Sequence, residues 1–106
     1  MQGYQLTFFT QQDRTHNRKP LAQWIVEEAR NMGIRGATMI TAAEGYGRDK
    51  KVRSAGFFEL ADQPLQVVLA VTEEEAERVF DRLKQENLNI FYVKAPIEFG
   101  MSADRL

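Results

Sequence analysis

The sequence predicts a single α+β domain, in which two helices cover one face of a four-stranded antiparallel sheet. Four segments have the composition of strands, two carry apolar residues at helical spacing, and their order is strand, helix, strand, strand, helix, strand. That order is the ferredoxin-like split βαβ pattern. The 106 residues suit one domain, placed at residues 1–106, with a flexible loop at about residues 45–63 and a tail at about residues 97–106.

The first half of the chain contains two predicted strands and the first predicted helix. Apolar and polar side chains alternate at the start of residues 4–10, which predicts a strand, and the polar residues 11–19 predict a loop. Pro20 suits the first turn of a helix, and Gly33 is a natural helix terminator. Residues 36–43 predict the second strand. The buried stripe of the helix is expected to consist of Leu21, Trp24, Ile25, Ala29 and Met32.

The second half contains the other two strands and the second helix. Residues 65–71 are almost entirely apolar and predict a strand. Thr72 is followed three residues later by Glu75, which is a capping box and predicts that a helix starts there and ends at Asn87. Residues 89–95 predict the fourth strand.

The second face of the sheet is predicted to be covered by another copy of the chain. A strand exposed on one side shows clean alternation of polar and apolar residues, but LQVVLAV does not. Aromatic residues also stand side by side, as Phe8 with Phe9 and Phe91 with Tyr92. Because the chain is short, a sister copy is the simplest cover, and we expect a symmetric oligomer.

Composition excludes several classes of function. A net charge of −1 argues against general binding of nucleic acid or anionic membranes, and the absence of cysteine excludes disulfides, zinc–thiolate sites and cysteine nucleophiles. The N-terminal residues lack the pattern of a signal peptide, and no apolar run approaches the roughly 20 residues needed to span a bilayer. A soluble cytoplasmic protein without membrane insertion is therefore expected.

The segment AEGYGRDKKVRSAGFFEL, after the second predicted strand, is the candidate site. Gly45 and Gly47 permit backbone angles closed to other residues, and successive N–H groups in such a turn can bind an anion. Arg48 could hold a phosphate with two hydrogen bonds, while Lys50 and Lys51 act as point charges. The candidate ligand-binding residues are Gly45, Tyr46, Gly47, Arg48, Asp49, Lys50 and Lys51.

The alternative is a tight turn whose charges only keep the loop soluble. Asp49 weakens the case for a bare triphosphate site, since it could hold a metal or fix an arginine instead. Three further residues, Arg53, Phe57 and Phe58, are candidates for contact with a partner protein. Phe57 and Phe58 are adjacent and point to opposite faces if they lie in a strand, so a place in the core or an interface is favoured over stacking on a base.

Other polar residues receive simpler interpretations. His16 is the only histidine and makes a poor metal site, and its neighbour Asn17 is expected to cap the first helix. Arg18 and Lys19 either face the same cleft as the loop or are solvated charges. Capping explains the acidic residues 73–75. No catalytic arrangement is legible, so we expect a binding protein without a metal site rather than an enzyme.

The candidate segment resembles a known family. EGYGRDK after a strand resembles the G-F-G-R-Q-K segment that begins the T-loop of PII signal-transduction proteins. The longer stretch NRKPLAQWIVEEARNMGIRGATMITAAEGYG is still more similar to the uncharacterised PII-like proteins, and the similarity runs from about residue 10 to 95. The resemblance implies a ferredoxin-like homotrimer. It also implies a small effector, usually an adenine nucleotide, in clefts between subunits, and a loop that touches a target protein such as a transporter or enzyme.

Departures from the PII pattern limit what the resemblance implies. At the position where PII proteins carry a glycine-rich basic loop, this chain has only Asn87, Leu88 and Asn89. Asp49 replaces a glutamine that in PII proteins helps to bind the metal and its ligands. Tyr46 lies at the base of a short loop, so tyrosine modification is not implied. The usual ligand pair of PII proteins, magnesium ATP and 2-oxoglutarate, is not implied either. The alternatives are a ligand-free trimeric interaction module, a CutA-like metal-tolerance protein, whose histidine and cysteine donors this chain lacks, and a small ferredoxin-like isomerase or monooxygenase.

Overall fold

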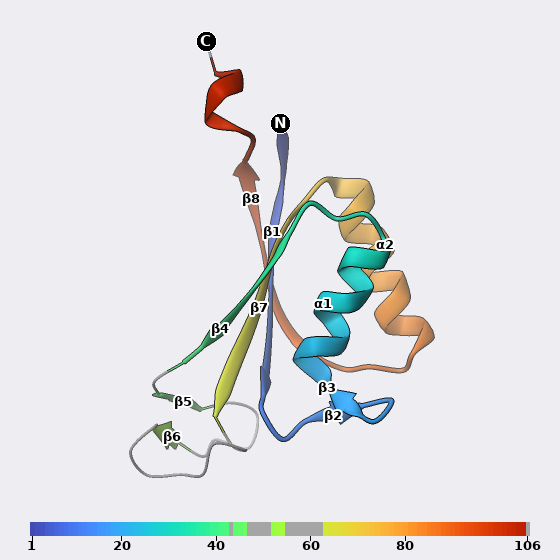
Figure 1. Cartoon of the computed structure of the whole chain (residues 1–106), viewed down its shortest axis with the longest axis vertical. Coiled ribbons are helices and arrows are strands. Elements are labelled where there is room, and N and C mark those ends of the chain that lie inside the picture. Colours follow the sequence, from blue (N-terminus) through green and yellow to red (C-terminus); the bar gives the residue numbers. More distant parts are fainter. Residues whose placement is uncertain (43, 47–51, 55–62, 106) are drawn as a thin grey trace.

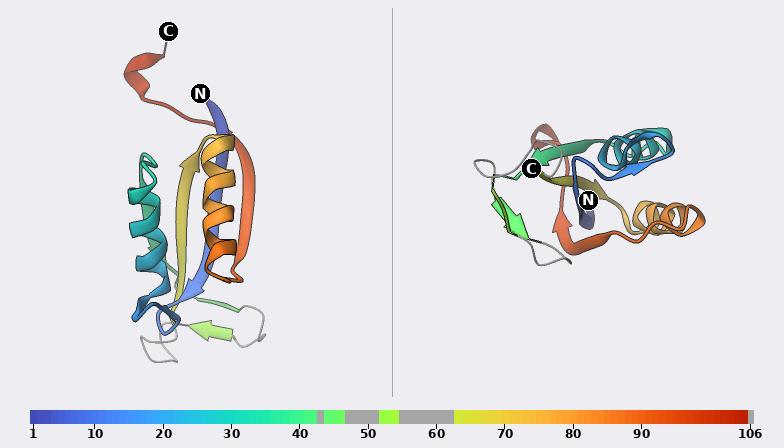
Figure 2. Two further views of the ribbon diagram at one scale, coloured as in Figure 1. Left: turned by 90° about the vertical axis from the view of Figure 1, so that its right-hand side faces the viewer. Right: turned by 90° about the horizontal axis from the view of Figure 1, so that it is seen from below.

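The computed structural model describes residues 1–42, 44–46, 52–54 and 63–105, which form a four-stranded sheet with two helices on one face (Figures 1 and 2). Neighbouring strands are antiparallel and follow the order β4-β7-β1-β8, with the first and third strands of the split pattern at the centre. The predicted ferredoxin-like fold is therefore confirmed. The strands are β1 (Gln2–Gln11), β4 (Ala37–Thr41), β7 (Pro64–Val71) and β8 (Phe91–Glu98).

Both predicted helices form, as α1 (Leu21–Asn31) and α2 (Glu73–Gln85). The capping box of α2 is present: the Glu75 N–H donates to Thr72 Oγ1 over 3.2 Å, and the Thr72 N–H donates to Glu75 Oε1 over 2.8 Å. Two N–H groups that the helix cannot satisfy are thereby paired, which fixes where α2 begins.

The start of α1 differs from the prediction. Pro20 is its N-cap, and no side chain caps the helix. Instead, the Leu21 N–H donates to the Arg14 carbonyl over 2.8 Å. The expectation that Asn17 caps α1 is wrong, because residues 15–20 form a small hairpin of β2 (Thr15–His16) and β3 (Lys19–Pro20), with Asn17 in its turn. This hairpin replaces the end of the predicted loop and the predicted helical position of Pro20.

The core lies between the helices and one face of the sheet. Every second residue of β7 is buried there, and Trp24, which is only 5% exposed, has the predicted place in the core. Burial of such side chains contributes about 1.5–3 kcal/mol each and is the main driving force of the fold. The principal buried side chains are Leu6, Phe8, Leu21, Trp24, Ile25, Leu65, Val67, Leu69, Val71, Ala76, Val79 and Leu83.

The pairing register shows which side chains lie on the face of the sheet away from the helices. Phe8 and Tyr92 are paired across β1 and β8, and both contact the ring of Phe80 in α2, at 5.9 and 4.8 Å between centroids. Their neighbours Phe9 and Phe91 therefore point to the opposite face, where their rings lie 5.5 Å apart. Phe91 is 62% exposed, and no described helix covers this face.

The two ends of the chain meet at one end of the sheet. Met1 and Phe99 extend the β1–β8 ladder with reciprocal backbone bonds of 3.0 and 2.9 Å. The guanidinium of Arg35 lies 5.2 Å from the centroid of the Phe99 ring. Strand β8 thus runs to Glu98, beyond the expected end at residue 95, and a short 3-10 helix (Ser102–Asp104) follows it.

Candidate functional site

Three connecting segments lie at the end of the sheet opposite the termini (Figure 1). They are the β2–β3 hairpin, the connection between β4 and β7, and the turn from α2 to β8. The Gln12 N–H donates to the Gln63 carbonyl over 3.0 Å, which ties β1 to the end of the β4–β7 connection. Arg14 Nη2 donates to the Asn89 carbonyl over 2.7 Å, which ties the hairpin to the turn after α2. We call this the loop end of the molecule.

The β4–β7 connection contains a second small hairpin that the sequence did not predict. Strand β5 (Glu44–Tyr46) pairs with β6 (Val52–Ser54), so Gly45 lies opposite Arg53. The Ala42 N–H donates to the Pro64 carbonyl over 2.9 Å and closes the base of the connection.

This hairpin pairs Gly45, from the predicted ligand-binding set, with Arg53, from the predicted partner-binding set, and it pairs Tyr46 with Val52. The remaining predicted site residues lie outside the described part of the chain, and their roles stay predictions. They are Gly47, Arg48, Asp49, Lys50, Lys51, Phe57 and Phe58.

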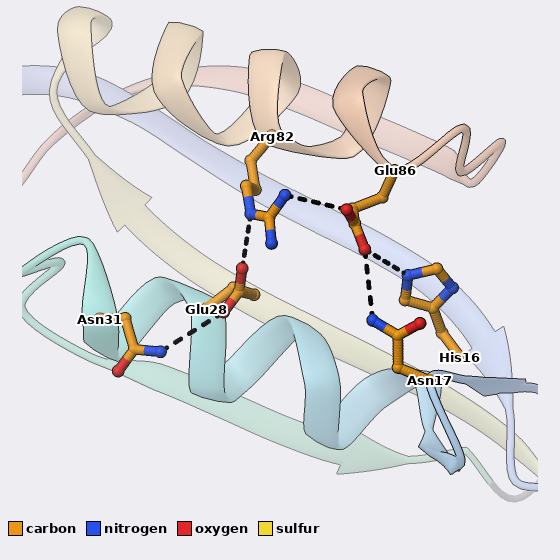
Figure 3. A network of polar contacts seen from close by, with 6 residues as sticks. All are labelled: His16, Asn17, Glu28, Asn31, Arg82 and Glu86. Atoms are coloured by element: carbon orange, nitrogen blue, oxygen red, sulfur yellow. Dashed lines mark hydrogen bonds and ion pairs between the residues drawn. The ribbon is translucent and has the colours of Figure 1, made fainter.

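The side chain of Glu86, just after α2, is the centre of a polar network (Figure 3). His16 Nε2 lies 2.9 Å from Glu86 Oε1, and Asn17 Nδ2 donates to the same oxygen over 3.3 Å. Arg82 Nη1 donates to Glu86 Oε2 over 3.0 Å, and its Nε donates to Glu28 Oε1 over 2.6 Å. The network therefore joins the β2–β3 hairpin to both helices.

Hydrogen bonding favours the charged forms of Glu86 and Arg82. The bond from His16, together with those from Arg82 and Asn17, holds the pKa of Glu86 below its usual range. The bond to Glu28 raises the pKa of Arg82. Glu86 is therefore a carboxylate whose contacts are with protein groups, and its position suits a structural tie better than ligand binding.

Trp24 forms the apolar base of the network. The ring of His16 meets it edge-on at 4.9 Å between centroids, and the guanidinium of Arg82 lies 5.6 Å from its centroid. Sequence reasoning missed this arrangement, because His16 and Glu86 are 70 residues apart. Only the i,i+4 spacing of Arg82 and Glu86 gave a local signal.

The two cations left open by the sequence have different surroundings. Lys19 Nζ forms an ion pair of 2.5 Å with Glu27 on α1, so it belongs to the helix surface. Arg18 is at the turn of the β2–β3 hairpin with a φ of 66°, a conformation that favours glycine. Within the described ranges, no three acidic or histidine side chains are arranged to hold a metal ion. None of the described helices is long and apolar enough to cross a membrane.

Comparison with known proteins assigns the chain to a family. The sequence profile of the DUF190 family, described as an uncharacterized ACR, matches residues 3–95. The chain belongs to the DUF190 family. It is 32% identical over 80 residues to a UPF0166 protein of Aquifex aeolicus, and this match covers 74% of the chain and 76% of that protein.

Solved structures of PII-like proteins have the same fold as this DUF190 protein. A putative PII-like signaling protein from Thermus thermophilus matches it with a TM-score of 0.62 at 22% identity, over 91% of this chain and 85% of that protein. CPII, a nitrogen regulatory PII-like protein from Thiomonas intermedia that was solved bound to ADP, AMP and bicarbonate, matches with a TM-score of 0.66 at 17% identity, over 97% and 92% of the two chains. The resemblance to PII-like proteins is thereby confirmed for the fold.

Proposed function

We propose that this DUF190 protein is a homotrimeric, non-enzymatic PII-like regulator that binds a small anionic effector of the adenine nucleotide class in clefts between subunits. Its proposed location is the cytoplasm. The observation that carries the proposal is a basic segment that begins with two glycines, residues 45–51, in the connection from β4 to β7 of a PII-like fold. CPII, with this fold, was solved with ADP and AMP.

The chemistry of the segment supports an anionic ligand. Arg48 presents a planar guanidinium that matches two phosphate oxygens, and Lys50 and Lys51 add positive charge without a fixed geometry. The β5–β6 hairpin places Gly45 opposite Arg53, so another cation joins the same segment. Because the whole chain has a net charge of −1, this positive charge is local and favours a small anion over a long polyanion.

In this proposal the ligand regulates a partner by changing which arrangement of the segment is populated. A ligand shifts such an equilibrium only by its difference in affinity for the two arrangements. Arg53, Phe57 and Phe58 follow the proposed ligand contacts directly and would contact the target protein. Their proximity in sequence lets one ligand alter both the charge and the apolar surface that a partner meets.

The uncovered sheet face supports the proposed trimer. The pairing register places Phe9, Phe91, Val93 and Ile40 on this face, and the last three are 62%, 46% and 43% exposed. A cluster of exposed apolar side chains on a small domain typically marks an interface. Sister copies would bury it and would also form the clefts that the proposal requires.

Calorimetric titration with AMP, ADP, ATP and cyclic dinucleotides tests the ligand. We expect at least one of them to bind and Arg48→Ala to weaken it by roughly 10-fold or more, the loss of one charge-assisted contact. Arg30→Ala removes the same charge from the far end of α1 and should leave binding unchanged. A folded trimer that gives no heat with any of these nucleotides would refute the nucleotide part of the proposal.

A ligand-free interaction module is the second candidate, because the same basic and aromatic segment could bind a protein directly. It would be favoured if a purified partner bound equally well with and without every nucleotide in the panel. It would also require that Arg48→Ala and Lys50→Ala leave that partner's binding unaltered.

A further inference from the structure

Two large aromatic side chains are well exposed among those that the structure describes. Phe91 and Tyr92 are consecutive on β8 and are 62% and 48% exposed. Because they are neighbours in a strand, they lie on opposite faces of the sheet. Phe91 belongs to the face that the proposed trimer would cover. Tyr92 lies on the side of the helices, and its exposure therefore needs another explanation.

The ring of Tyr92 is held in place by the core. It meets the Phe80 ring of α2 at 4.8 Å between centroids with an interplanar angle of 62°, and Phe80 in turn meets the fully buried Phe8 at 5.9 Å. These contacts fix the position of the ring while part of it stays exposed to solvent. A ring that is already ordered loses little conformational freedom when a planar ligand packs on it, which favours binding.

Two lysines flank the ring of Tyr92. Lys94 is two residues further along β8 and lies on the same face, with its Nζ 4.2 Å from the centroid of the Tyr4 ring. Lys84 is one turn after Phe80 on the same side of α2. Because α2 and β8 run in opposite directions, Lys84 lies toward the loop end and Lys94 toward the termini (Figure 1). Neither lysine forms an ion pair with another described residue.

We propose that Tyr92 is the base-binding residue of the effector site, with its ring stacked on the adenine and Lys84 on the side of the phosphate. An aromatic ring can stack on a planar base, and a neighbouring cation suits the phosphate that the base carries. The phosphate lies toward Lys84 because the loop end also carries the proposed anion-binding segment, residues 45–51. On the side of Lys94, by contrast, Glu77 adds negative charge two turns before Lys84 on α2. This inference rests on the proposed function and names the residue that recognises the base.

Tyr92 and the anion-binding segment of the same chain lie at opposite edges of the sheet. The segment follows β4, whereas Tyr92 is on β8, and these edge strands are three strand spacings apart, roughly 14 Å. A single nucleotide contacts both when the segment comes from one copy and Tyr92 from its neighbour. This agrees with the clefts between subunits that the proposed function requires, and each cleft is then incomplete without the neighbouring copy.

Photolabelling with 8-azido-AMP and 8-azido-ADP tests the contact in the natural protein, because light couples the base to the side chains beside it. Trypsin cleaves after Lys and Arg, so Tyr92 is released in the peptide 85–94 and Tyr46 in the peptide 36–48. We expect label in the peptide 85–94 that an excess of AMP or ADP removes. Label confined to other peptides would overturn the inference while the proposed function stands. A natural protein that takes no such label and gives no heat with any nucleotide would refute both.

Substitution of Tyr92 separates base recognition from a structural role. Tyr92→Ser should weaken the binding of adenine nucleotides by roughly 10-fold or more, the loss of one stacking contact. Ribose 5-phosphate has no base, so its affinity should stay the same. A general disturbance of the fold or the assembly would weaken both ligands alike, and that result would count against the inference. Tyr92→Phe keeps the ring and should keep the natural affinity.

Mixed trimers test whether two copies share the site. Chains with Tyr92→Ser and chains with Arg48→Ala are co-expressed with different affinity tags, and the trimers that contain both are isolated. In a closed ring of this kind, one cleft combines natural Arg48 of one copy with natural Tyr92 of its neighbour. We expect that cleft to bind the nucleotide with natural affinity, although trimers of either variant alone bind weakly. Mixed trimers that bind as weakly as the two pure variants would overturn the shared site.

Discussion

Gly3→Ala tests the packing where the two ends of the chain meet. A Cβ atom at Gly3 would lie 2.1 Å from the Val71 carbonyl oxygen and 2.6 Å from Cε1 of Phe99. The Phe99 ring can rotate away, but the Val71 oxygen belongs to a central strand, so relief requires that β1 and β7 separate locally. Overpacking of this kind costs about 1–3 kcal/mol. Because one clash is with backbone, we expect the upper end, about 3 kcal/mol.

Urea unfolding followed by the fluorescence of Trp24, the single tryptophan, measures this loss. Protein concentration must be held constant, because association adds to apparent stability. Gly36→Ala is the matched control: nothing lies within 4 Å of its added Cβ, so stability should stay equal or rise by about 0.4–1 kcal/mol. Gly3→Ala and Gly36→Ala variants of equal stability would refute the reasoning.

Three further changes test the helix cap, the polar network and the hairpin turn. Thr72→Ala removes the cap of α2 and should lower the free energy of unfolding, measured by thermal unfolding, by about 1 kcal/mol. An unchanged melting temperature would contradict the role of the cap. The His16 hydrogen bond lowers the pKa of Glu86, so this carboxylate stabilises the fold above its unfolded pKa, about 4.3, and the gain is lost as pH falls through the lower folded pKa. The free energy of unfolding of Glu86→Gln should therefore fall less with decreasing pH than that of the natural protein. An equal pH dependence in the two proteins would argue against this role of Glu86. Arg18→Gly should raise stability by about 0.5 kcal/mol in urea, since φ is 66° there; a decrease would show that the turn is not strained.

Local patterns were sufficient to predict the main elements of the fold. The capping box at Thr72 is legible because its two partners are three residues apart, and the structure confirms it. Alternation in β7 was hidden in the sequence, because both of its faces carry apolar residues. The structure reveals the alternation through burial: every second residue of β7 is buried against the helices, and the residues between them are half-buried on the other face.

The errors arise where distant residues decide local structure. Asn17 is a good N-cap by residue type, but the β2–β3 hairpin gives it a φ of 51°, and its side chain donates to Glu86 instead. That partner is 69 residues away, so nothing near Asn17 in the sequence indicates it. The β5–β6 hairpin was missed for another reason: each strand has only three residues, too few for a visible period.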